Sequence, residues 1–427
     1  MIIIIGAGLA GLVCAKELVA AGRQVLVLEG SDDIGGRVRT DVTGDGYRFD
    51  RGFQVLFTAY PAVQRHLNLE NLKPRIFDPG AIQVKDGKHY EIADPLRKPG
   101  DLVAGLLNPL IPVSDKLRVL RLTQQISGLS TSDIFSGKGE PDGQDESIET
   151  YLRRLGFTDE GFIDTFARPF YGGILLKRDL SPSARIFQFT YKMLASGDII
   201  VPAEGMQKIP EQLAAHLPKG ALRRNTRVDK LLLDGGKVSG VVLENGERID
   251  AEQAVVATDS PTAAQLTGIS LPTQPVSSTY LYFAGETQLY PQRKIVLNAN
   301  ADAFINNAVL ITNIAPTYAP PHKHLLSVTL PGSPEGDDEQ LARQCRAELA
   351  QWYPDADLTR WKLVNTYRIP FSQFAQPPGI YDQLPDNHTA IEGLFLAGEY
   401  TKSSSIQGAM HSGEHAAKAI LRSKMPV

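Results

Sequence analysis

The chain opens with Ile2-Ile3-Ile4-Ile5-Gly6-Ala7-Gly8-Leu9-Ala10-Gly11, an apolar run that leads directly into three glycines at the spacing Gly-x-Gly-x-x-Gly. This pattern predicts a buried strand, a tight turn and the start of a helix. The strand can turn sharply at Gly6, a phosphate can approach the backbone at Gly8, and helix can pack on strand at Gly11 only where no side chain intervenes. The free N–H groups at the start of the helix would bind the pyrophosphate of a dinucleotide.

A second apolar run, residues 24–28, ends at Glu29, eighteen residues after Gly11. A carboxylate at this distance can accept hydrogen bonds from both ribose hydroxyls of an adenosine, and it would repel a 2′-phosphate. The segment therefore fits FAD or NAD and by itself leaves the choice between them open. An ordinary strand-to-helix turn without a ligand is the alternative, but the strand, the helix and the acid together favour a dinucleotide site.

Length and charge narrow the class of protein. The 427 residues exceed the usual size of one hydrophobic core, which predicts two domains. The formal net charge is −4 and no polybasic run occurs, so we expect no nucleic-acid partner. Cys14 and Cys345 are the only cysteines, and a structural disulfide is not expected.

The sequence also bears on membranes and location. No run of eighteen apolar residues occurs, so no transmembrane helix is predicted. Because the first strand begins at residue 2, we expect no cleaved targeting peptide and a cytoplasmic protein. Residues 101–113 are apolar and interrupted by Pro109 and Pro112. They could make a peripheral membrane contact, with a loop in the protein core as the alternative.

The order of elements along the chain predicts an α/β fold with two interleaved domains. Residues from about 96 to 200 show helical spacing, including 116–126 and 146–166. Strands are expected at 227–233, 238–243 and 254–258, joined by glycine turns, and again at 277–283 and 325–330. A helix is expected at 338–352, then a strand at 394–399 and a last helix at 406–421. We assign residues 1–95, 201–265 and 385–427 to a Rossmann-type domain, and residues 96–200 and 266–384 to an α+β substrate domain.

Four features in this order resemble the flavin amine oxidase superfamily, which includes phytoene desaturases, protoporphyrinogen oxidases and monoamine oxidases. They are the first glycine motif with Glu29, the turn Gly35-Gly36-Arg37, the strands ending in Ala257-Thr258, and the C-terminal Leu396-Ala397-Gly398-Glu399 before a helix. Residues 397–409 look most like the carotenoid desaturase branch. The resemblance implies a GR2-like FAD-binding domain and an extended FAD whose isoalloxazine lies at the domain junction.

The resemblance also implies which residues hold FAD. The pyrophosphate would lie on the first helix and Arg37, Val228 would hold the adenine edge through its backbone, and Glu399 would bind near the ribityl or pyrophosphate. The N-terminus of the last helix would face the flavin N1–C2=O side, where reduced flavin carries negative charge. The implied FAD contacts are Gly6, Gly8, Leu9, Ala10, Gly11, Glu29, Gly30, Gly36, Arg37, Val38, Gly52, Phe53, Gln54, Val55, Val228, Ala257, Gly398, Glu399, Ile406, Gln407 and Ala409.

Two departures from the family pattern narrow the chemistry. Phe371 stands where monoamine oxidases carry the cysteine that links the flavin, so we expect non-covalent FAD. Ser372 and Ser405 stand where that branch places two tyrosines around the amine, which disfavours amine oxidation.

The substrate pocket is expected to be apolar and aromatic, with residues 166–173, 187–191 and 367–374 as its lining and a plain domain core as the alternative. Hydride removal requires little beyond a C–H bond about 3–3.5 Å from flavin N5 in a dry site, so no acid–base pair is predicted. The pocket candidates are Arg168, Tyr171, Phe371, Ser372 and Ser405, with a structural ion pair as the alternative for Arg168.

Three further side chains are interpreted as non-catalytic. Lys294 could correspond to a flavin-facing lysine, but a solvated surface lysine is the preferred interpretation. His411 and His415 lie one helical turn apart, which is more typical of a partly exposed helix face than of a metal site.

The function that the resemblance implies is an FAD-dependent desaturase or oxidase. It would remove hydride from a hydrophobic small molecule, such as a carotenoid-like isoprenoid or a tetrapyrrole, and pass electrons to oxygen or a quinone. A redox-neutral polyene isomerase and an amine oxidase are the alternative enzymes. A prenyl-chain-binding escort-type protein is the non-enzyme alternative, against which the complete set of FAD motifs argues.

Overall fold

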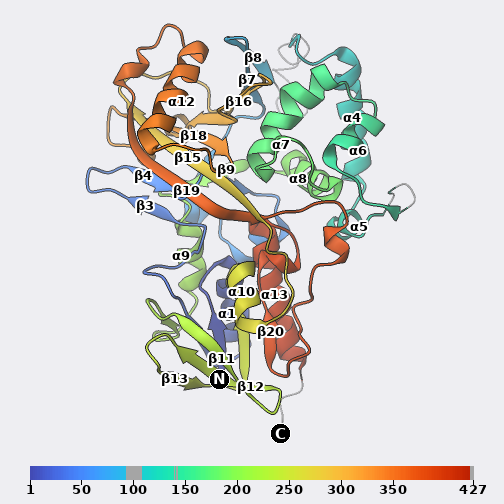
Figure 1. Cartoon of the computed structure of the whole chain (residues 1–427), viewed down its shortest axis with the longest axis vertical. Coiled ribbons are helices and arrows are strands. Elements are labelled where there is room, and N and C mark those ends of the chain that lie inside the picture. Colours follow the sequence, from blue (N-terminus) through green and yellow to red (C-terminus); the bar gives the residue numbers. More distant parts are fainter. Residues whose placement is uncertain (93–107, 139, 141–142, 424–427) are drawn as a thin grey trace.

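The computed structural model describes residues 1–92, 108–138, 140 and 143–423. Its lower half in Figure 1 contains both termini, the helices α1 (Leu9–Ala20) and α13 (Ile406–Arg422), and a parallel sheet. The strand order of that sheet is β10 (Leu222–Arg223), β2 (Val25–Leu28), β1 (Ile2–Ile5), β14 (Gln253–Val256) and β20 (Leu394–Leu396). Three distant parts of the chain therefore build one sheet.

The apolar character of these strands follows from their position, because a parallel sheet covered on both faces buries every side chain. All four residues of β1 and of β2 are buried. One face packs on α1 and α13, which run side by side in Figure 1. The other face packs against β11 (Val228–Asp234) and β12 (Lys237–Leu243), which form a three-stranded antiparallel sheet with β13 (Arg248–Asp250).

The upper half in Figure 1 is built on a seven-stranded sheet. Its strand order is β19 (Lys362–Phe374), β15 (Pro275–Gly285), β18 (His324–Pro331), β17 (Asn307–Leu310), β16 (Val296–Asn298), β7 (Ala81–Lys85) and β8 (Lys88–Ile92). Helix α12 (Asp338–Trp352) buries Leu341, Cys345 and Leu349 in the core on this sheet.

The positions of β7 and β8 differ from the predicted domain boundary at residue 95. We assigned residues 1–95 as a whole to the Rossmann-type domain, but β7 pairs in parallel with β16 and antiparallel with β8, inside the seven-stranded sheet. The assignment is wrong for these strands because hydrogen bonding to β16, more than two hundred residues away, decides where they lie.

A group of helices stands beside the seven-stranded sheet (Figure 1). Its members are α4 (Val113–Ser127), α5 (Thr131–Phe135), α6 (Ile148–Arg154), a π-helix η4 (Asp159–Ala167), α7 (Arg168–Leu175) and α8 (Ala184–Ser196). The helix expected at 116–126 is confirmed. The segment expected as helical at 146–166 instead divides after α6, because Gly156 has a φ of +85° and Gly161 has non-helical angles.

Shorter elements connect these parts. They are β3 (Thr40–Val42), β4 (Arg48–Asp50), β5 (Leu56–Phe57), α2 (Pro61–His66), η1 (Glu70–Leu72), β6 (Pro74–Ile76), β9 (Ile199–Pro202), α9 (Lys208–Ala214), α10 (Ser260–Thr267), α11 (Ile311–Ile314), η5 (Pro316–Tyr318), η6 (Leu358–Arg360), η7 (Ile380–Asp382) and η8 (Glu399–Thr401).

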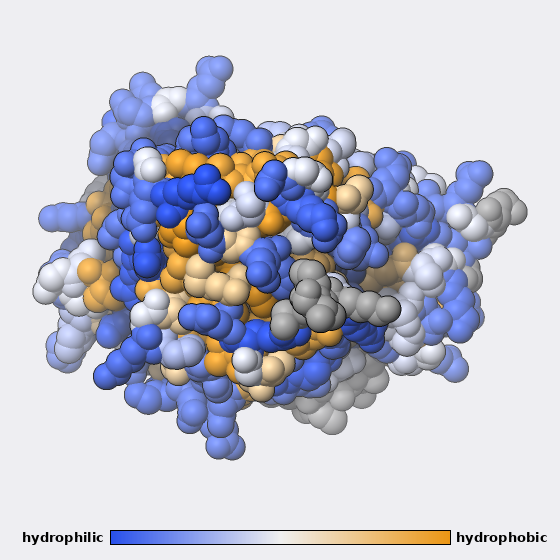
Figure 2. Space-filling model, turned by 90° about the horizontal axis from the view of Figure 1, so that it is seen from below, coloured by the Kyte–Doolittle hydropathy of each residue, from blue (hydrophilic) through white to orange (hydrophobic). Residues whose placement is uncertain are grey.

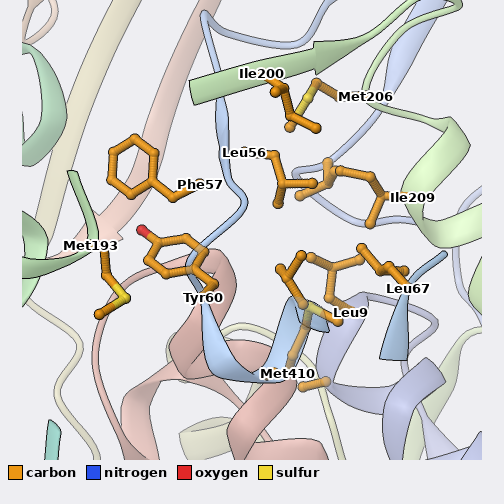
Figure 3. Close-up of a cluster of buried hydrophobic side chains, with 14 of the residues drawn as sticks. Leu9, Leu56, Phe57, Tyr60, Leu67, Met193, Ile200, Met206, Ile209 and Met410 are labelled. Atoms are coloured by element: carbon orange, nitrogen blue, oxygen red, sulfur yellow. The ribbon is translucent and has the colours of Figure 1, made fainter. Parts of the chain in front are cut away.

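One hydrophobic core joins the two halves. Figure 3 shows Leu9 of α1 and Met410 of α13 close to side chains of β5, β9, α8 and α9. Phe57 and Tyr60 belong to the same cluster. Phe57 lies opposite Ile199 where β5 pairs with β9. Since this core is continuous, the two halves are held in a fixed relation across any site between them.

The structure also bears on the cysteines, on membrane-spanning helices and on the apolar stretch 101–113. Cys14 and Cys345 are both buried and unpaired. Within the described residues, no helix combines the length and apolar character needed to cross a bilayer. Residues 101–107 of the apolar stretch lie outside the described residues, while Asn108 and Ile111 are buried. The lower end of the molecule presents hydrophobic residues among hydrophilic ones (Figure 2).

Candidate flavin and substrate site

The first turn shows a separate physical reason for each of its glycines. Gly6 has a φ of +106°, and a Cβ there would lie 2.7 Å from the carbonyl oxygen of Ala257. A Cβ on Gly11 would collide with the carbonyl oxygen of Gly6. A Cβ on Gly8 would meet nothing within 4 Å, and the backbone there is extended. Gly6 and Gly11 are thus required by the protein itself, whereas Gly8 leaves open space at the N-terminus of α1.

Glu29 is held at the end of β2 by donors from the protein. The backbone N–H of Ala7 donates to its Oε2 at 2.7 Å, and the N–H and hydroxyl of Ser31 donate to its Oε1 at 2.8 and 2.7 Å. These contacts fix the carboxylate beside the glycine turn. Oε1 already accepts two hydrogen bonds, whereas Oε2 accepts one and keeps a lone pair with which it could accept a ribose hydroxyl.

Arg37 connects three segments that are far apart in the sequence. Its Nη1 donates to Glu399 Oε1 at 2.6 Å and to the carbonyl oxygen of Ser372 at 2.9 Å. Its guanidinium carbon also lies 5.9 Å from the centre of the Phe371 ring. Because Glu399 is buried, the pairing with Arg37 balances a charge that would otherwise be unfavourable there.

Helix α13 begins beside this ion pair. Ser405 is its N-cap, and the Ser405 hydroxyl accepts a hydrogen bond from the backbone N–H of Gly408 at 2.9 Å. Gln407 points elsewhere: its Oε1 accepts from the N–H of Ala62 at 2.8 Å and ties α13 to α2. The positive end of the α13 dipole therefore faces the space next to Ser405 and Ile406.

A cavity of about 550 Å³ connects these features. It runs from the glycine turn and Glu29 past Arg37 to the start of α13. Of the implied FAD contacts, those that line the cavity are Gly6, Gly8, Leu9, Ala10, Glu29, Gly30, Gly36, Arg37, Val38, Gly52, Phe53, Gln54, Val55, Val228, Ala257, Gly398, Glu399, Ile406 and Ala409. Gly11 instead packs against the Gly6 carbonyl, and Gln407 binds the N–H of Ala62 in α2.

The far part of the cavity is apolar and lies against the upper half of the molecule. Its lining includes Phe53, Phe57, Tyr60, Phe77, Phe170, Ile174, Leu176, Ile199, Tyr280, Ile295, Ile369 and Phe371. Burial raises the pKa of Tyr60 and of Tyr280, so both phenols stay neutral at physiological pH. Ser372, Ser405, Gln373 and Asn307 are polar residues in this part of the wall.

Several of these lining residues have no signal in the sequence. Phe57 and Tyr60 come from β5 and the turn into α2, and Phe77, Tyr280 and Ile295 come from segments without a motif. In the sequence, an isolated aromatic residue of a hydrophobic core cannot be distinguished from one that lines a pocket. Arg227, next to the predicted Val228, also lines the cavity, and the sequence could have suggested it by adjacency.

Arg168 and Tyr171 lie outside the cavity lining. Arg168 pairs with Asp164 at 2.7 Å and with Glu149 at 2.5 Å, which agrees with the structural alternative for this residue. Tyr171 is buried against Phe187, with ring centres 4.6 Å apart. The structure therefore does not bring either candidate to the substrate end.

The structure also shows where Lys294, His411 and His415 lie. Lys294 was expected on the surface, but it is buried and its Nζ lies 3.2 Å from Glu91 Oε2. The expectation of a solvated lysine is wrong, because Nζ is paired inside the fold. The rings of His411 and His415 are 4.3 Å apart, and within the described residues no group of three or more ligating side chains could hold a metal.

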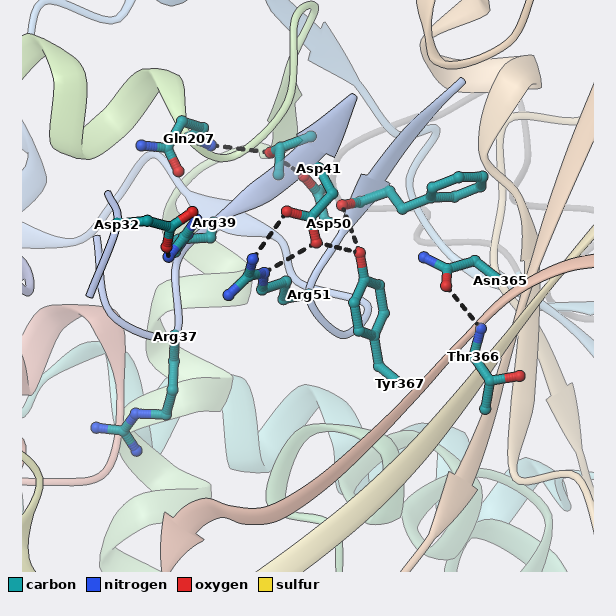
Figure 4. A network of polar contacts seen from close by, with 12 residues as sticks. Asp32, Arg37, Arg39, Asp41, Asp50, Arg51, Gln207, Asn365, Thr366 and Tyr367 are labelled. Carbon is teal, nitrogen blue, oxygen red and sulfur yellow. Dashed lines mark hydrogen bonds and ion pairs between the residues drawn. The ribbon is translucent and has the colours of Figure 1, made fainter. Parts of the chain in front are cut away.

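A polar network supports the loop that carries Gly52 and Phe53 (Figure 4). Arg51 donates to both oxygens of Asp41 at 2.9 Å, and the hydroxyl of Tyr367 donates to Asp41 Oδ2 at 2.5 Å. Burial raises the pKa of the neighbouring Asp50 to about 6, against the opposing hydrogen bonds from Thr40, Met206 and Tyr318. The network thus fixes the hairpin of β3 and β4 to β19 beside the cavity.

Residues 9–421 match the model of the family described as flavin containing amine oxidoreductase, and the chain belongs to this family. The resemblance inferred from the motifs, the α/β fold class and a flavin-dependent oxidoreductase are confirmed, and the cofactor of the family is a flavin.

Two relatives match over nearly the whole chain. The chain is 25% identical over 475 residues to 15-cis-phytoene desaturase, chloroplastic/chromoplastic, of Solanum lycopersicum, covering 99% of this chain and 77% of the relative. It is 26% identical over 481 residues to the probable zeta-carotene desaturase of Synechococcus elongatus, covering 99% and 98%. Among solved structures, putrescine oxidase bound to putrescine matches with a TM-score of 0.74 at 18% identity, covering 98% of each chain. That last similarity concerns the fold alone.

Proposed function

We propose that this protein binds FAD non-covalently and oxidises a hydrophobic small molecule, with a polyene isoprenoid as the preferred substrate class. The observation that carries the proposal is the single cavity that begins at a dinucleotide-type turn and ends in an aromatic and aliphatic wall. The residues of the first part fit an FAD. Gly8 leaves space for a pyrophosphate, and Glu29 Oε2 can accept a ribose hydroxyl. Arg37 is bound to Glu399 and Ser372 through Nη1, and its other guanidinium N–H groups could donate to a phosphate.

The side chains at the apolar end have two tasks in this proposal, to exclude water and to orient the substrate. FAD held by these residues would supply the acceptor for a hydride from a substrate C–H bond. Phe170, Ile174 and their neighbours exclude water and orient an apolar chain toward the cofactor. The N-terminus of α13 stabilises negative charge beside Ser405 and Ile406. The neutral phenols of Tyr60 and Tyr280 leave this wall without an ionised base.

Non-covalent binding is supported by the residues around the cavity. Phe371, which the family resemblance aligns with the flavin-linking cysteine of monoamine oxidases, is among the lining residues, and a phenyl ring cannot form a thioether. Both cysteines of the chain, Cys14 and Cys345, are buried in cores elsewhere. Acid precipitation of the purified protein should therefore leave all flavin in the supernatant, and chromatography should identify it as FAD. Flavin retained in the pellet would contradict this part of the proposal.

The substrate class is tested by anaerobic reduction. We expect the yellow protein to lose its oxidised-flavin absorbance when mixed with zeta-carotene or phytoene in detergent micelles, and to keep it with putrescine. Reduction by putrescine alone would favour the amine oxidase alternative. Geometric isomerisation of a polyene by pre-reduced protein, without net oxidation, would favour the isomerase. A colourless protein that takes up no FAD would leave the escort-type alternative.

The electron acceptor is the last element of the proposal. We propose oxygen or a quinone, as the resemblance to the flavin amine oxidase superfamily implies. Protein reduced by substrate under nitrogen should be mixed with air-saturated buffer or with a soluble quinone. The acceptor that restores the oxidised spectrum faster is the functional one.

A further inference from the structure

Tyr60 carries an unpaired hydroxyl in the wall of the apolar end of the cavity. The residue lines the cavity and is 7% exposed. In the part of the chain that the structure describes, its hydroxyl has no hydrogen-bond partner. Burial alone acts on the pKa of this phenol and raises it, so the hydroxyl keeps its proton and can donate. A buried hydroxyl without a partner costs free energy, which suggests that a ligand supplies the partner.

The other polar side chains of this wall differ from Tyr60. The hydroxyl of Tyr280 is hydrogen-bonded to Ser278. Gln54 Oε1 and Ser404 Oγ are unpaired, but both atoms are closed off from solvent, so a ligand cannot reach them. The remaining polar side chains, each with a partner within the protein, are Ser372, Ser405, Gln373 and Asn307. Among the described polar residues of this wall, Tyr60 therefore combines contact with the cavity and the lack of a partner.

The ring of Tyr60 is held in place, so the hydroxyl cannot turn to a distant partner. It stacks on Phe189 of α8, with ring centres 5.8 Å apart and an interplanar angle of 1°. The ring of Phe57, another lining residue, is centred 5.1 Å away, and Figure 3 shows the Tyr60 hydroxyl on the side of Phe57. Tyr60 directly precedes α2, whose Ala62 N–H donates to Gln407 of α13. The hydroxyl thus has a fixed position in the apolar wall.

We propose that the Tyr60 hydroxyl binds an oxygen atom of the substrate, so that the apolar end selects an isoprenoid alcohol or ketone over the hydrocarbon of the same length. A ligand that fills this end displaces water from the hydroxyl. A hydrocarbon would leave the hydroxyl unpaired in apolar surroundings, whereas an oxygen of the ligand accepts its hydrogen bond. A site with a polar group placed for its substrate rejects the analogue that lacks the matching group.

This selectivity rests on the proposed function, because it assumes that the apolar end holds the substrate. It is tested by binding rather than by turnover. The probes are lycopene, a hydrocarbon polyene, and rhodopin, which is the same chain with one terminal hydroxyl. The full-length protein is loaded with FAD, reduced with dithionite under nitrogen so that no oxidation takes place, and titrated with each polyene in detergent micelles. The change in polyene absorbance gives the dissociation constants.

Two variants assign the selectivity to one hydroxyl. We expect the wild type to bind rhodopin about tenfold more tightly than lycopene. Tyr60→Phe should abolish this preference by weakening rhodopin binding, while lycopene binding stays the same or improves. Tyr280→Phe is the matched control, because Tyr280 lines the same wall and is 6% exposed, but its hydroxyl already has a partner. That variant should keep the preference of the wild type. Flavin absorbance and circular dichroism verify the fold of each variant.

Three results would overturn the role of Tyr60 and leave the proposed function in place. They are equal affinity of the wild type for both polyenes, a preference for rhodopin that Tyr60→Phe retains, and a preference that Tyr280→Phe removes equally. A Tyr60→Phe variant that loses affinity only for decylubiquinone would also overturn it, because the hydroxyl would then serve the electron acceptor. A wild type that binds neither polyene would contradict the proposed function as well.

Discussion

At the scale of single residues, the first turn separates two uses of glycine that look identical in the sequence. Gly11 is needed because a Cβ would collide with the Gly6 carbonyl oxygen, a contact within the apoprotein. Gly8 has space around it and a φ of −73°, which alanine also adopts. Only a ligand in that space would explain why a side chain is absent at Gly8.

This difference predicts distinct outcomes for two alanine variants. Gly8→Ala should leave the unfolding free energy of the apoprotein within about 0.5 kcal/mol of wild type. It should weaken FAD binding at least about tenfold, since the methyl group occupies ligand space. Gly11→Ala should destabilise the apoprotein by about 1–3 kcal/mol through overpacking. Urea unfolding of apoprotein and quenching of FAD fluorescence measure the two quantities. Equal loss of stability in both variants would contradict the ligand role of Gly8.

At the scale of elements, α13 is held by its contacts with α2. Glu414 receives hydrogen bonds from Arg65 at 2.6 and 2.8 Å and lies 2.6 Å from His66 Nε2. At the second residue of the helix, the Gln407 side chain accepts a hydrogen bond from the N–H of Ala62. These contacts fix the direction in which the N-terminus of α13 points, and hence the position of its dipole at the cavity.

Removing the charge of Glu414 should therefore lower the free energy of unfolding by an amount that depends on pH. Burial alone would raise its pKa, but the hydrogen bonds from His66 and Arg65 outweigh burial and lower the pKa to about 2 from 4.5. The stabilisation is therefore present above pH 4.5 and lost as pH falls toward 2. Glu414→Gln should lower the unfolding free energy by about 2 kcal/mol at pH 7.

The same substitution should cost progressively less below pH 4.5, as followed by urea unfolding. Glu392→Gln is the matched control, because its pair with Lys237 is about 60% exposed on both sides. That variant should change stability by less than about 1 kcal/mol. A penalty for Glu414→Gln that is constant from pH 7 to pH 3 would contradict the assigned origin.

At the scale of the whole molecule, the cavity is bounded by both halves. The parallel sheet contributes Gly8 and Glu29, whereas β15 and β19 of the seven-stranded sheet contribute Tyr280 and Phe371. Because the hydrophobic core in Figure 3 is continuous between the halves, a ligand in the cavity should stabilise them together.

Cofactor removal tests this coupling. The two tryptophans, Trp352 and Trp361, both lie in the core under α12, away from the parallel sheet. FAD at about 100 times its Kd should add about 2.7 kcal/mol of stability and raise the midpoint of tryptophan fluorescence as well as that of circular dichroism. Riboflavin, which lacks the adenosine diphosphate, should have a smaller effect. A tryptophan transition that does not respond to FAD would show that the halves unfold independently.

Features that depend on neighbouring residues could be predicted from the sequence. The glycine spacing and Glu29 defined the strand, turn and helix at the start of the chain. The helices at 338–352 and 406–421 appear as α12 and α13, almost residue for residue, because their apolar periodicity and caps are local. The motifs also sufficed for the family, and most of the implied FAD contacts line the cavity.

Features that depend on distant partners followed from the folded chain instead. It moved β7 and β8 into the seven-stranded sheet, paired Arg168 with acids outside the cavity, and buried Lys294. It also chose which aromatic residues form the pocket wall and which, like Tyr171, fill a core. A sequence records that a side chain avoids water, but whether it faces a neighbour or a cavity is fixed by chain segments hundreds of residues away.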